Sequence, residues 1–206
     1  TKANSLLTPE ISLYNPDTEA YTYDLEGAQA LAESSGLSGM TLTYIYNADR
    51  PNMDAVAVVI QQQLAQIGVN LSIEGMDSSS FFPRFFAASS YGFNGQETTW
   101  DLGTNGWDSM RGSTLNQAYS YLNQADDAWG MTEACGELAL AVNTTTDEAE
   151  AKQLADELMD VAMDQYRIYP LTYTNYVLVS QKNVTGLDSS PIVPEFADYL
   201  GISVNG

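Results

Sequence analysis

The order of apolar and polar residues predicts a strand, a helix and a second strand near the start of the chain. Residues 41–47 (TLTYIYN) are rich in β-branched and aromatic side chains, which is typical of a strand. Apolar residues then recur at helical spacing from 54 to 66, and Gly68 is a helix stop signal. Residues 69–75 alternate between apolar and polar side chains, which predicts the second strand. This spacing favours a right-handed crossover between parallel strands.

Similar patterns predict the remaining elements. Asp24 is a good N-cap for a helix that stops at Gly36, and Asp147 is a good N-cap for a later helix with Leu154, Leu158 and Val161 on its inner face. A third strand is predicted at 98–107, where it runs into a Gly-rich loop. The other predicted elements are helices at 78–88, 114–122 and 133–142, and a strand or hairpin at 168–182. The 78–88 helix carries four Phe at helical spacing, which is typical of a core.

The ends of the chain lack these periodic patterns. Residues 1–23 contain two prolines and predict an irregular strap along the surface, and residues 191–206 predict a tail. No repeat or second boundary interrupts the rest, so we predict one domain spanning 1–206. The fold class is α/β, with a central mixed, mostly parallel sheet flanked by helices. The chain opens on TKANS without an initiator Met, so we expect a piece of a longer protein.

The charge balance narrows the possible partners. The chain has 27 acidic and 7 basic residues, a net charge of −20 and no His. Binding nucleic acid or an anionic membrane surface needs clustered Lys and Arg, so we expect neither partner. Two interpretations of the acidic surface remain open: an affinity for cationic ligands, or a solubilising exterior on an exported protein.

The residue types available also limit the chemistry. Without His, the commonest general base and metal ligand is missing, so we expect no metal and no cofactor. The single Cys135 has no disulfide partner and is expected to be a small buried side chain. One rival function is a secreted hydrolase with a carboxylate pair, for example Asp101 and Asp108. A second rival is an acidic cell-surface interaction module.

Four stretches in the same order resemble family 5 of the extracellular solute-binding proteins, the oligopeptide, dipeptide and nickel-binding group. Together they cover nearly the whole chain. The stretch YTYDLEGAQALAESSGL resembles the family's "YD-x-x-x-A-x-x-L-L-x-x-x-G" helix, and residues 41–77 resemble its strand and the following "IQ-x-x-L-x-x-I-G-[IV]-x-V" helix. The stretch DLGTNGW resembles the family's "D-x-x-x-x-G-W" strand, and residues 147–187 resemble its late helix, its "P-L" strand and its "V-x-G" turn.

The resemblance implies a periplasmic-binding-protein type II lobe, the C-terminal lobe of a two-lobed protein. It implies a substrate-binding component of a bacterial ABC importer rather than an enzyme. Such a protein captures a small-molecule or oligopeptide ligand in the cleft between its lobes and delivers it to the ABC transporter permease subunits. It lies on the extracellular face of the membrane or in the periplasm, and as a lipoprotein it touches the membrane only through a lipid anchor, here expected outside this chain.

A general rule of open α/β sheets locates the candidate binding site. Ligands bind beyond the carboxyl ends of the strands. For the first and third predicted strands, the rule selects these residues: Asn47, Asp49, Arg50, Asn105, Trp107, Asp108 and Arg111.

The resemblance assigns roles to some of these positions. It implies that Trp107 forms an aromatic wall of the cleft. The alternative is that Trp107 is a core residue packed at the end of the sheet. The family's carboxylate for a peptide α-ammonium corresponds here to Met110, a departure from the pattern that puts amine-terminated peptides in doubt. Asp108 is the candidate substitute, or it caps the loop. Arg84 meets a ligand carboxylate or extends to solvent past the phenylalanines.

Overall fold

The computed structural model describes residues 1–9, 11–86, 99–106, 133–175, 177–189 and 197–205. The chain divides into two compact units, one formed by residues 22–107 and the other by residues 1–21 together with 108–206. The prediction of a single domain spanning 1–206, with a strap at 1–23 and a tail at 191–206, stays a prediction.

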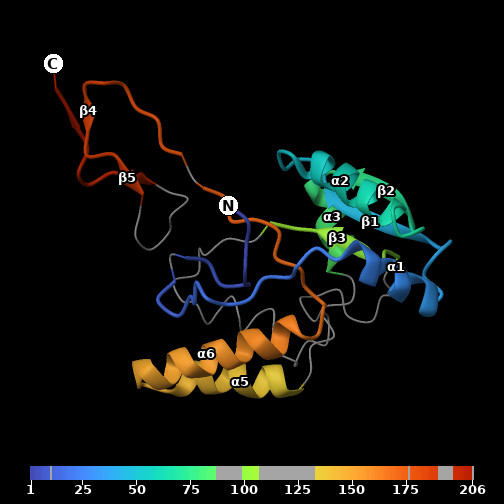
Figure 1. Ribbon diagram of the computed structural model, residues 1–206. Coiled ribbons are helices and arrows are strands. Elements are labelled where there is room, and N and C mark those ends of the chain that lie inside the picture. The colour runs from blue at the N-terminus through green and yellow to red at the C-terminus, as the bar shows by residue number, and fades with distance from the viewer. Residues whose placement is uncertain (10, 87–98, 107–132, 176, 190–196, 206) are drawn as a thin grey trace. The chain divides into compact units, whose positions relative to one another are not determined.

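A three-stranded parallel sheet forms the centre of the first unit (Figure 1). Its middle strand, β1 (Thr41–Asn47), pairs along its whole length with β2 (Asn70–Met76). On its other side β1 pairs with the short strand β3 (Leu102–Thr104), with Tyr44 opposite Leu102. Both pairings are parallel, which confirms the prediction of parallel strands on either side of a helix.

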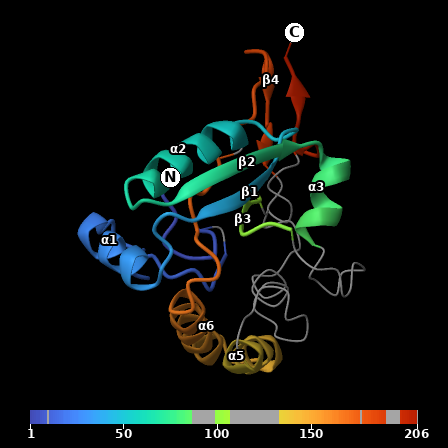
Figure 2. The ribbon, with the colours of Figure 1, turned by 90° about the vertical axis from the view of Figure 1, so that its right-hand side faces the viewer.

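Helices cover both faces of this sheet (Figure 2). The helix α2 (Met53–Ala65) packs Ala57, which is fully buried, against the face that carries Tyr44 and Leu71. Alternate side chains of β1 face the other way, toward α3 (Ser78–Phe85). Phe85 of α3 lies so close to the sheet there that a Cβ on Gly103 would be 3.0 Å from its ring. A parallel sheet covered on both faces is consistent with the β-branched and aromatic sequence of β1, in which the adjacent residues Tyr44 and Ile45 are both buried.

The helix boundaries follow the predicted signals. The helix α1 (Leu25–Ser34) begins after Asp24, whose carboxylate accepts the amide hydrogen of Gly27 at 2.9 Å. Gly36 follows α1 and Gly68 follows α2, both at a φ of 77°. This left-handed conformation is available to glycine without steric cost, so both glycines end their helices.

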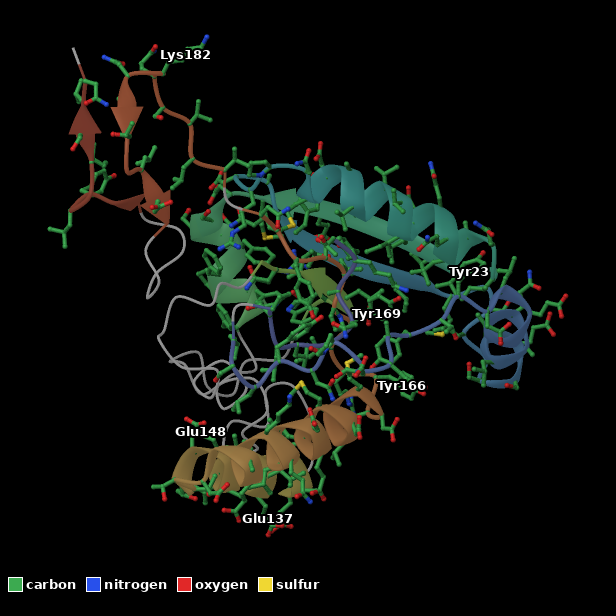
Figure 3. The ribbon with its side chains drawn as sticks, turned by 60° about the vertical axis from the view of Figure 1, so that its left-hand side comes forward. Tyr23, Glu137, Glu148, Tyr166, Tyr169 and Lys182 are labelled. Atoms are coloured by element: carbon green, nitrogen blue, oxygen red, sulfur yellow. The ribbon has the colours of Figure 1, made fainter. Side chains whose placement is uncertain are left out.

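The second unit is built around a hairpin of two helices, α5 (Glu133–Thr144) and α6 (Glu148–Met163). Their facing sides bury small and medium apolar residues, and Cys135 is fully buried among them, as predicted. The side chain of Leu7, from the irregular segment before Tyr21, is also buried in this core. Figure 3 shows the acidic side chains Glu137 and Glu148 on the outside of the hairpin.

The predicted strand or hairpin at 168–182 is wrong for the part of that segment that the structure describes. Its only pairing there is one antiparallel bridge between Thr172 and Lys2. β-branched residues fit a strand, but a strand forms only where a neighbour supplies hydrogen bonds, and Pro170 lacks an amide hydrogen. The side chains of Val177 and Val179 remain exposed.

The described C-terminal segments form two short antiparallel pairs. The strand β4 (Val184–Thr185) pairs with β7 (Ser203–Val204), and β5 (Asp188–Ser189) pairs with β6 (Ala197–Asp198). The predicted helix at 114–122 lies outside the described residues. No helix in the described ranges is long and apolar enough to cross a membrane.

The N-cap of α6 provides a test of the second unit. The Asp147 carboxylate accepts the amide hydrogens of Ala149 and Glu150 at 2.9 and 3.0 Å. We expect Asp147→Ala to lower the free energy of unfolding by about 1 kcal/mol, because two amides of the first turn lose their acceptor. Urea unfolding measures the loss, and Gln153→Ala at an exposed position of the same helix is the control. Equal stability of the two variants would contradict the role of this cap.

Candidate functional site

The carboxyl ends of the three parallel strands lie at one edge of the sheet. The strand β1 ends at Asn47, opposite Met76 at the end of β2. Tyr46 lies opposite Thr104, the last residue of β3. The loops that follow β1 and β3 therefore start from the same edge, where ligands bind in open α/β sheets. This arrangement was predicted from the sequence, and the candidate site is built at this edge.

The buried side chain of Asn47 stabilises this edge through hydrogen bonds to neighbouring residues. Its side chain is only 1% exposed. Its Oδ1 accepts the amide hydrogen of Asp49 at 3.0 Å, and its Nδ2 donates to the hydroxyl of Ser78 at 3.0 Å. A buried amide with these partners fixes the loop after β1 to the first residue of α3. Asn47 was predicted as a ligand contact, and the structure gives it internal partners.

Two carboxylates bind the first turn of α3. Asp49 accepts the amide hydrogen of Ser78 at 2.7 Å. Asp77, the N-cap, accepts the amide hydrogen of Ser80 at 2.9 Å and the hydroxyl hydrogen of Ser79 at 2.6 Å. The hydrogen bonds from Ser79 and Ser80 lower the pKa of the Asp77 carboxyl. Both carboxylates lie at the positive end of the helix dipole, where negative charge is stabilised.

Arg50 connects the loop after β1 to the residues after β3. Its Nη1 donates to the carbonyl oxygen of Gly106 at 2.7 Å. Its Cζ lies 6.0 Å from the centre of the Phe82 ring, within the range of a cation–π contact. A Cβ on residue 106 would lie 2.5 Å from Nη1, so glycine at this position leaves room for the guanidinium. The two loops are therefore joined side chain to backbone at the candidate edge.

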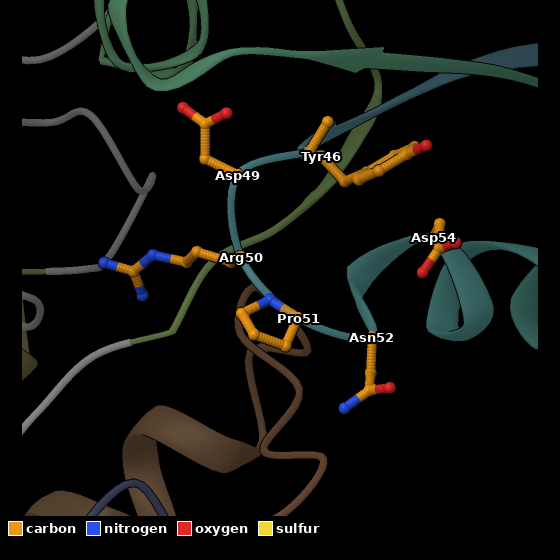
Figure 4. A pocket seen from close by; sticks show the side chains of 7 residues that line it. Tyr46, Asp49, Arg50, Pro51, Asn52 and Asp54 are labelled. Atoms are coloured by element: carbon orange, nitrogen blue, oxygen red, sulfur yellow. The ribbon is translucent and has the colours of Figure 1, made fainter.

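An open cavity of about 300 Å³ lies beside this connection. Figure 4 shows the loop between β1 and α2 around which its lining residues are grouped, and Arg50 leaves this loop on the side away from Asp54. Asn52 has a φ of 65°, a left-handed conformation that Asn tolerates better than most residues. The lining residues are Tyr46, Ala48, Asp49, Arg50, Pro51, Asn52 and Asp54.

The end of β3 contributes a hydroxyl pair and an amide. Tyr44 and Thr104 share a hydrogen bond between their side chains. Burial raises the pKa of the Tyr44 hydroxyl, against the smaller lowering effect of the bond to Thr104, so the hydroxyl stays protonated at neutral pH. The Oδ1 atom of Asn105, the next residue, is buried and accepts no hydrogen bond in the described structure. Asn105 thus keeps an acceptor available near the end of β3.

Arg84 is held by its own unit. Its guanidinium forms an ion pair with Glu74 on β2 and donates to the hydroxyl and carbonyl oxygens of Thr99, both at 2.8 Å. The indole Nε1 of Trp100 donates to the carbonyl oxygen of Arg84 at 3.0 Å, and the Trp100 ring stacks on Phe85 with a centroid distance of 5.3 Å. Trp100 is therefore a packing residue of this unit. Arg84 thus has partners within its own unit, where the sequence left open a ligand carboxylate or an extension to solvent.

The remaining sequence candidates are Trp107, Asp108, Met110 and Arg111, and they lie outside the described residues. The sheet-edge rule did not select five of the residues that line the cavity: Tyr46, Ala48, Pro51, Asn52 and Asp54. A Pro-Asn pair between a strand and a helix is a turn signal, and such loops at the carboxyl end of a strand are where binding residues concentrate. Within the described ranges, no group of three or more Asp, Glu or Cys residues could hold a metal ion.

Comparison with known proteins identifies the family. The family model described as "Bacterial extracellular solute-binding proteins, family 5 Middle" matches residues 1–129, more than half of the chain. The chain belongs to this family. The family whose motifs the sequence resembles is therefore confirmed.

Named relatives and solved structures agree with this assignment. Over 194 residues the chain is 26% identical to the glutathione-binding protein GsiB of Salmonella typhimurium, covering 90% of this chain and 37% of GsiB. A putative peptide binding protein, AppA from Clostridium difficile, superimposes with a TM-score of 0.83 at 23% identity, over 100% of this chain and 42% of that one. DppA from Helicobacter pylori, solved in complex with the peptide STSA, superimposes with a TM-score of 0.76 at 20% identity, over 99% of this chain and 39% of DppA.

These similarities show the fold and a difference in length. The predicted periplasmic-binding-protein fold is confirmed by the superpositions on AppA and DppA. The chain spans roughly two fifths of the length of these relatives, between 37% and 42%. The names of all three describe them as binding proteins, in the case of AppA as a putative one.

The internal role of Asn47 predicts a loss of stability on its removal. Asn47→Ala removes two hydrogen bonds, one from the amide of Asp49 and one to the hydroxyl of Ser78, and both are made by a side chain that is buried in wild type. We expect the free energy of unfolding to fall by about 1–3 kcal/mol, measured by urea unfolding. Asn70→Ala, at an exposed position of the same sheet, serves as control and should change stability by less than about 0.5 kcal/mol. Similar effects of both substitutions would argue against the internal role.

The lowered pKa of Asp77 predicts how stability depends on pH. A carboxyl whose pKa is lower in the folded than in the unfolded protein stabilises the fold above the unfolded-state value, here 3.8, and loses this effect as the pH falls through the folded-state value. Asp77→Asn has no such titration. We expect the stability of wild type relative to this variant to be constant near neutral pH and to fall as the pH decreases below about 5, where the unfolded-state carboxyl begins to bind protons. A difference that changes around neutral pH would contradict the assignment.

Proposed function

We propose that this chain is the C-terminal ligand-binding lobe of the substrate-binding component of a bacterial ABC importer. The complete protein captures a peptide-like or other small solute between its two lobes and delivers it to the permease subunits. It works on the extracellular face of the membrane or in the periplasm, held by a lipid anchor outside this chain. It catalyses no reaction on the solute.

The cavity at the carboxyl edge of the sheet is the observation that carries this proposal. In a solute-binding family, a cavity of about 300 Å³ beside the loops that follow β1 and β3 is suited to enclose part of a small ligand. Its lining supplies an aromatic ring, an amide, two carboxylates and a guanidinium, so it offers both hydrogen-bond donors and acceptors. The other lobe would cover the exposed side of the ligand.

The contacts of Asp101 favour a binding protein over the rival hydrolase. Asp101 precedes β3, and its Oδ2 accepts the amide hydrogen of Thr43 at 2.7 Å. It therefore stands at the amino end of β3, whereas the cavity lies beyond the carboxyl end of β1. A carboxylate pair of a hydrolase must face one substrate across a cleft, and Asp101 is poorly placed for that role.

The experiment is a binding titration of the full-length protein, followed by tryptophan fluorescence. The probes are glutathione, Met-Leu, the peptide Ser-Thr-Ser-Ala and Ni(L-His)2. The relative GsiB is named for glutathione, and similar solved structures contain the other three. We expect at least one probe to change the fluorescence saturably and to be recovered unaltered by mass spectrometry. Binding of none of the four, or conversion of a probe into product, would overturn the proposal.

A pair of Trp variants tests the position of the ligand. Trp107 immediately follows Gly106, the residue bound by Arg50. We expect Trp107→Ala to abolish the fluorescence response, because the ring proposed to lie against the ligand is removed. Trp100→Phe is the matched control, since its ring stacks on Phe85 in the core, and it should keep both response and affinity. A full response in Trp107→Ala would place the ligand elsewhere.

A further inference from the structure

Arg50 is held in one orientation by groups that do not neutralise its charge. Its Nη1 binds a main-chain carbonyl, that of Gly106, at 2.7 Å, and its guanidinium lies over the Phe82 ring. The side chain is partly buried and lines the cavity. A carbonyl and an aromatic ring orient a guanidinium, but neither carries a full negative charge.

Carboxylates are close in sequence to Arg50, yet neither pairs with it. Asp49 accepts the amide hydrogen of Ser78 at 2.7 Å, and Asp54 accepts that of Ala55 at 2.8 Å. In the described ranges the only ion pair within 4.0 Å joins Arg84 to Glu74. In a chain with 27 acidic and 7 basic residues, an arginine that is partly buried and lacks an acidic partner is unusual. Its charge is available to a ligand.

The geometry points to Arg50 as the residue that binds an anionic group of the solute, and we propose that this group is a carboxylate. This inference rests on the proposed function and specifies one end of the ligand. A guanidinium has five N–H donors in a planar fork, and the bond to Gly106 uses one of them. The other donors can bind the two oxygens of a carboxylate in parallel, which a lysine ammonium cannot do in the same way.

The bond to Gly106 makes this recognition more effective. An arginine that is free in solvent loses rotational freedom when it binds a ligand, and this loss weakens binding. Arg50 has already lost that freedom, because Gly106 and Phe82 fix its position before the ligand arrives. The absence of a side chain at residue 106 permits this contact, since a Cβ there would lie 2.5 Å from Nη1.

The competing interpretation is that Arg50 only connects the two loops. A purely structural Arg50 would affect the binding of all ligands equally, whatever their charge. A carboxylate-binding Arg50 would affect ligands with a carboxylate more than matched ligands without one. Comparing two ligands on each protein variant therefore separates the two roles, because loss of the loop connection cancels in the ratio.

The test uses the full-length protein and two pairs of probes by calorimetric titration. Each pair consists of a peptide and its C-terminal amide, for Met-Leu and for Ser-Thr-Ser-Ala. The amide keeps the size and the α-ammonium group of the peptide and removes only the carboxylate charge. We expect wild type to bind at least one free acid about 10- to 100-fold more tightly than its amide, as for a desolvated charge-assisted pair.

The variants are Arg50→Met, Arg50→Lys and the control Arg167→Met, which removes the same charge from the other unit. We expect Arg50→Met to bind acid and amide with Kd values equal within about twofold, and Arg50→Lys to keep part of the preference. Arg167→Met should keep the wild-type ratio, because Arg167 is exposed and salt screens its charge. If Arg50→Met does not fold, the ratio in Arg50→Lys decides the question.

The outcomes separate this inference from the proposed function. Wild-type binding of a peptide with no preference for the acid, or an undiminished preference in the Arg50 variants, would overturn the role of Arg50 and leave the binding function intact. If wild type binds neither peptide, the inference is overturned. The fluorescence titrations with glutathione and Ni(L-His)2 then decide the proposed function.

Discussion

The central position of β1 is the constraint on which the candidate site depends. Because β1 pairs in parallel with β2 on one side and with β3 on the other, chain segments far apart in sequence end at the same edge of the sheet. Residues 47 and 106, for example, are brought to this edge by backbone pairing alone. Side chains then refine the arrangement: Asn47 binds the start of α3, and Arg50 reaches the carbonyl of Gly106.

Local sequence signals were sufficient to predict the elements of this sheet. The alternation of Leu71 and Ile73 with polar residues specifies a strand with one better buried face, and glycines at φ values of 77° end the helices on either side of β1. The segment 168–182 shows where local signals fail. Its β-branched residues fit a strand, but whether one forms depends on a neighbouring strand, and that is a property of the whole fold.

The candidate site could be predicted only in part. The sheet-edge rule correctly brought Asn47, Asp49, Arg50 and Asn105 to one edge, because it depends only on strand direction. It could not separate the roles of these residues. Asn47 faces inward and is buried, whereas Arg50, three positions later, spans to a residue 56 positions away in the chain. Such long-range contacts leave no local pattern, so a single sequence does not reveal them.

The acidic composition gives the few basic residues a distinct importance. Arg84 pairs with Glu74 and joins α3 to β2, whereas Arg50 is oriented by uncharged groups beside a cavity. Two arginines of the same unit thus differ in how their charge is balanced. We attribute the first to the stability of the unit, and we propose a ligand as the partner of the second. In a family of solute-binding proteins, a fixed and unneutralised charge at the strand ends is suited to selecting solutes by their charge.

The most direct test of the account is hydrogen exchange of the full-length protein with and without a bound peptide, because it locates the ligand without altering any residue. The account predicts that a bound peptide slows amide exchange in residues 47–52 and 104–106, at the carboxyl edge of the sheet. It predicts no change at Met40, Val69 and Asp101, which precede the three strands. Protection confined to these preceding residues, with none at 47–52, would contradict the central claim.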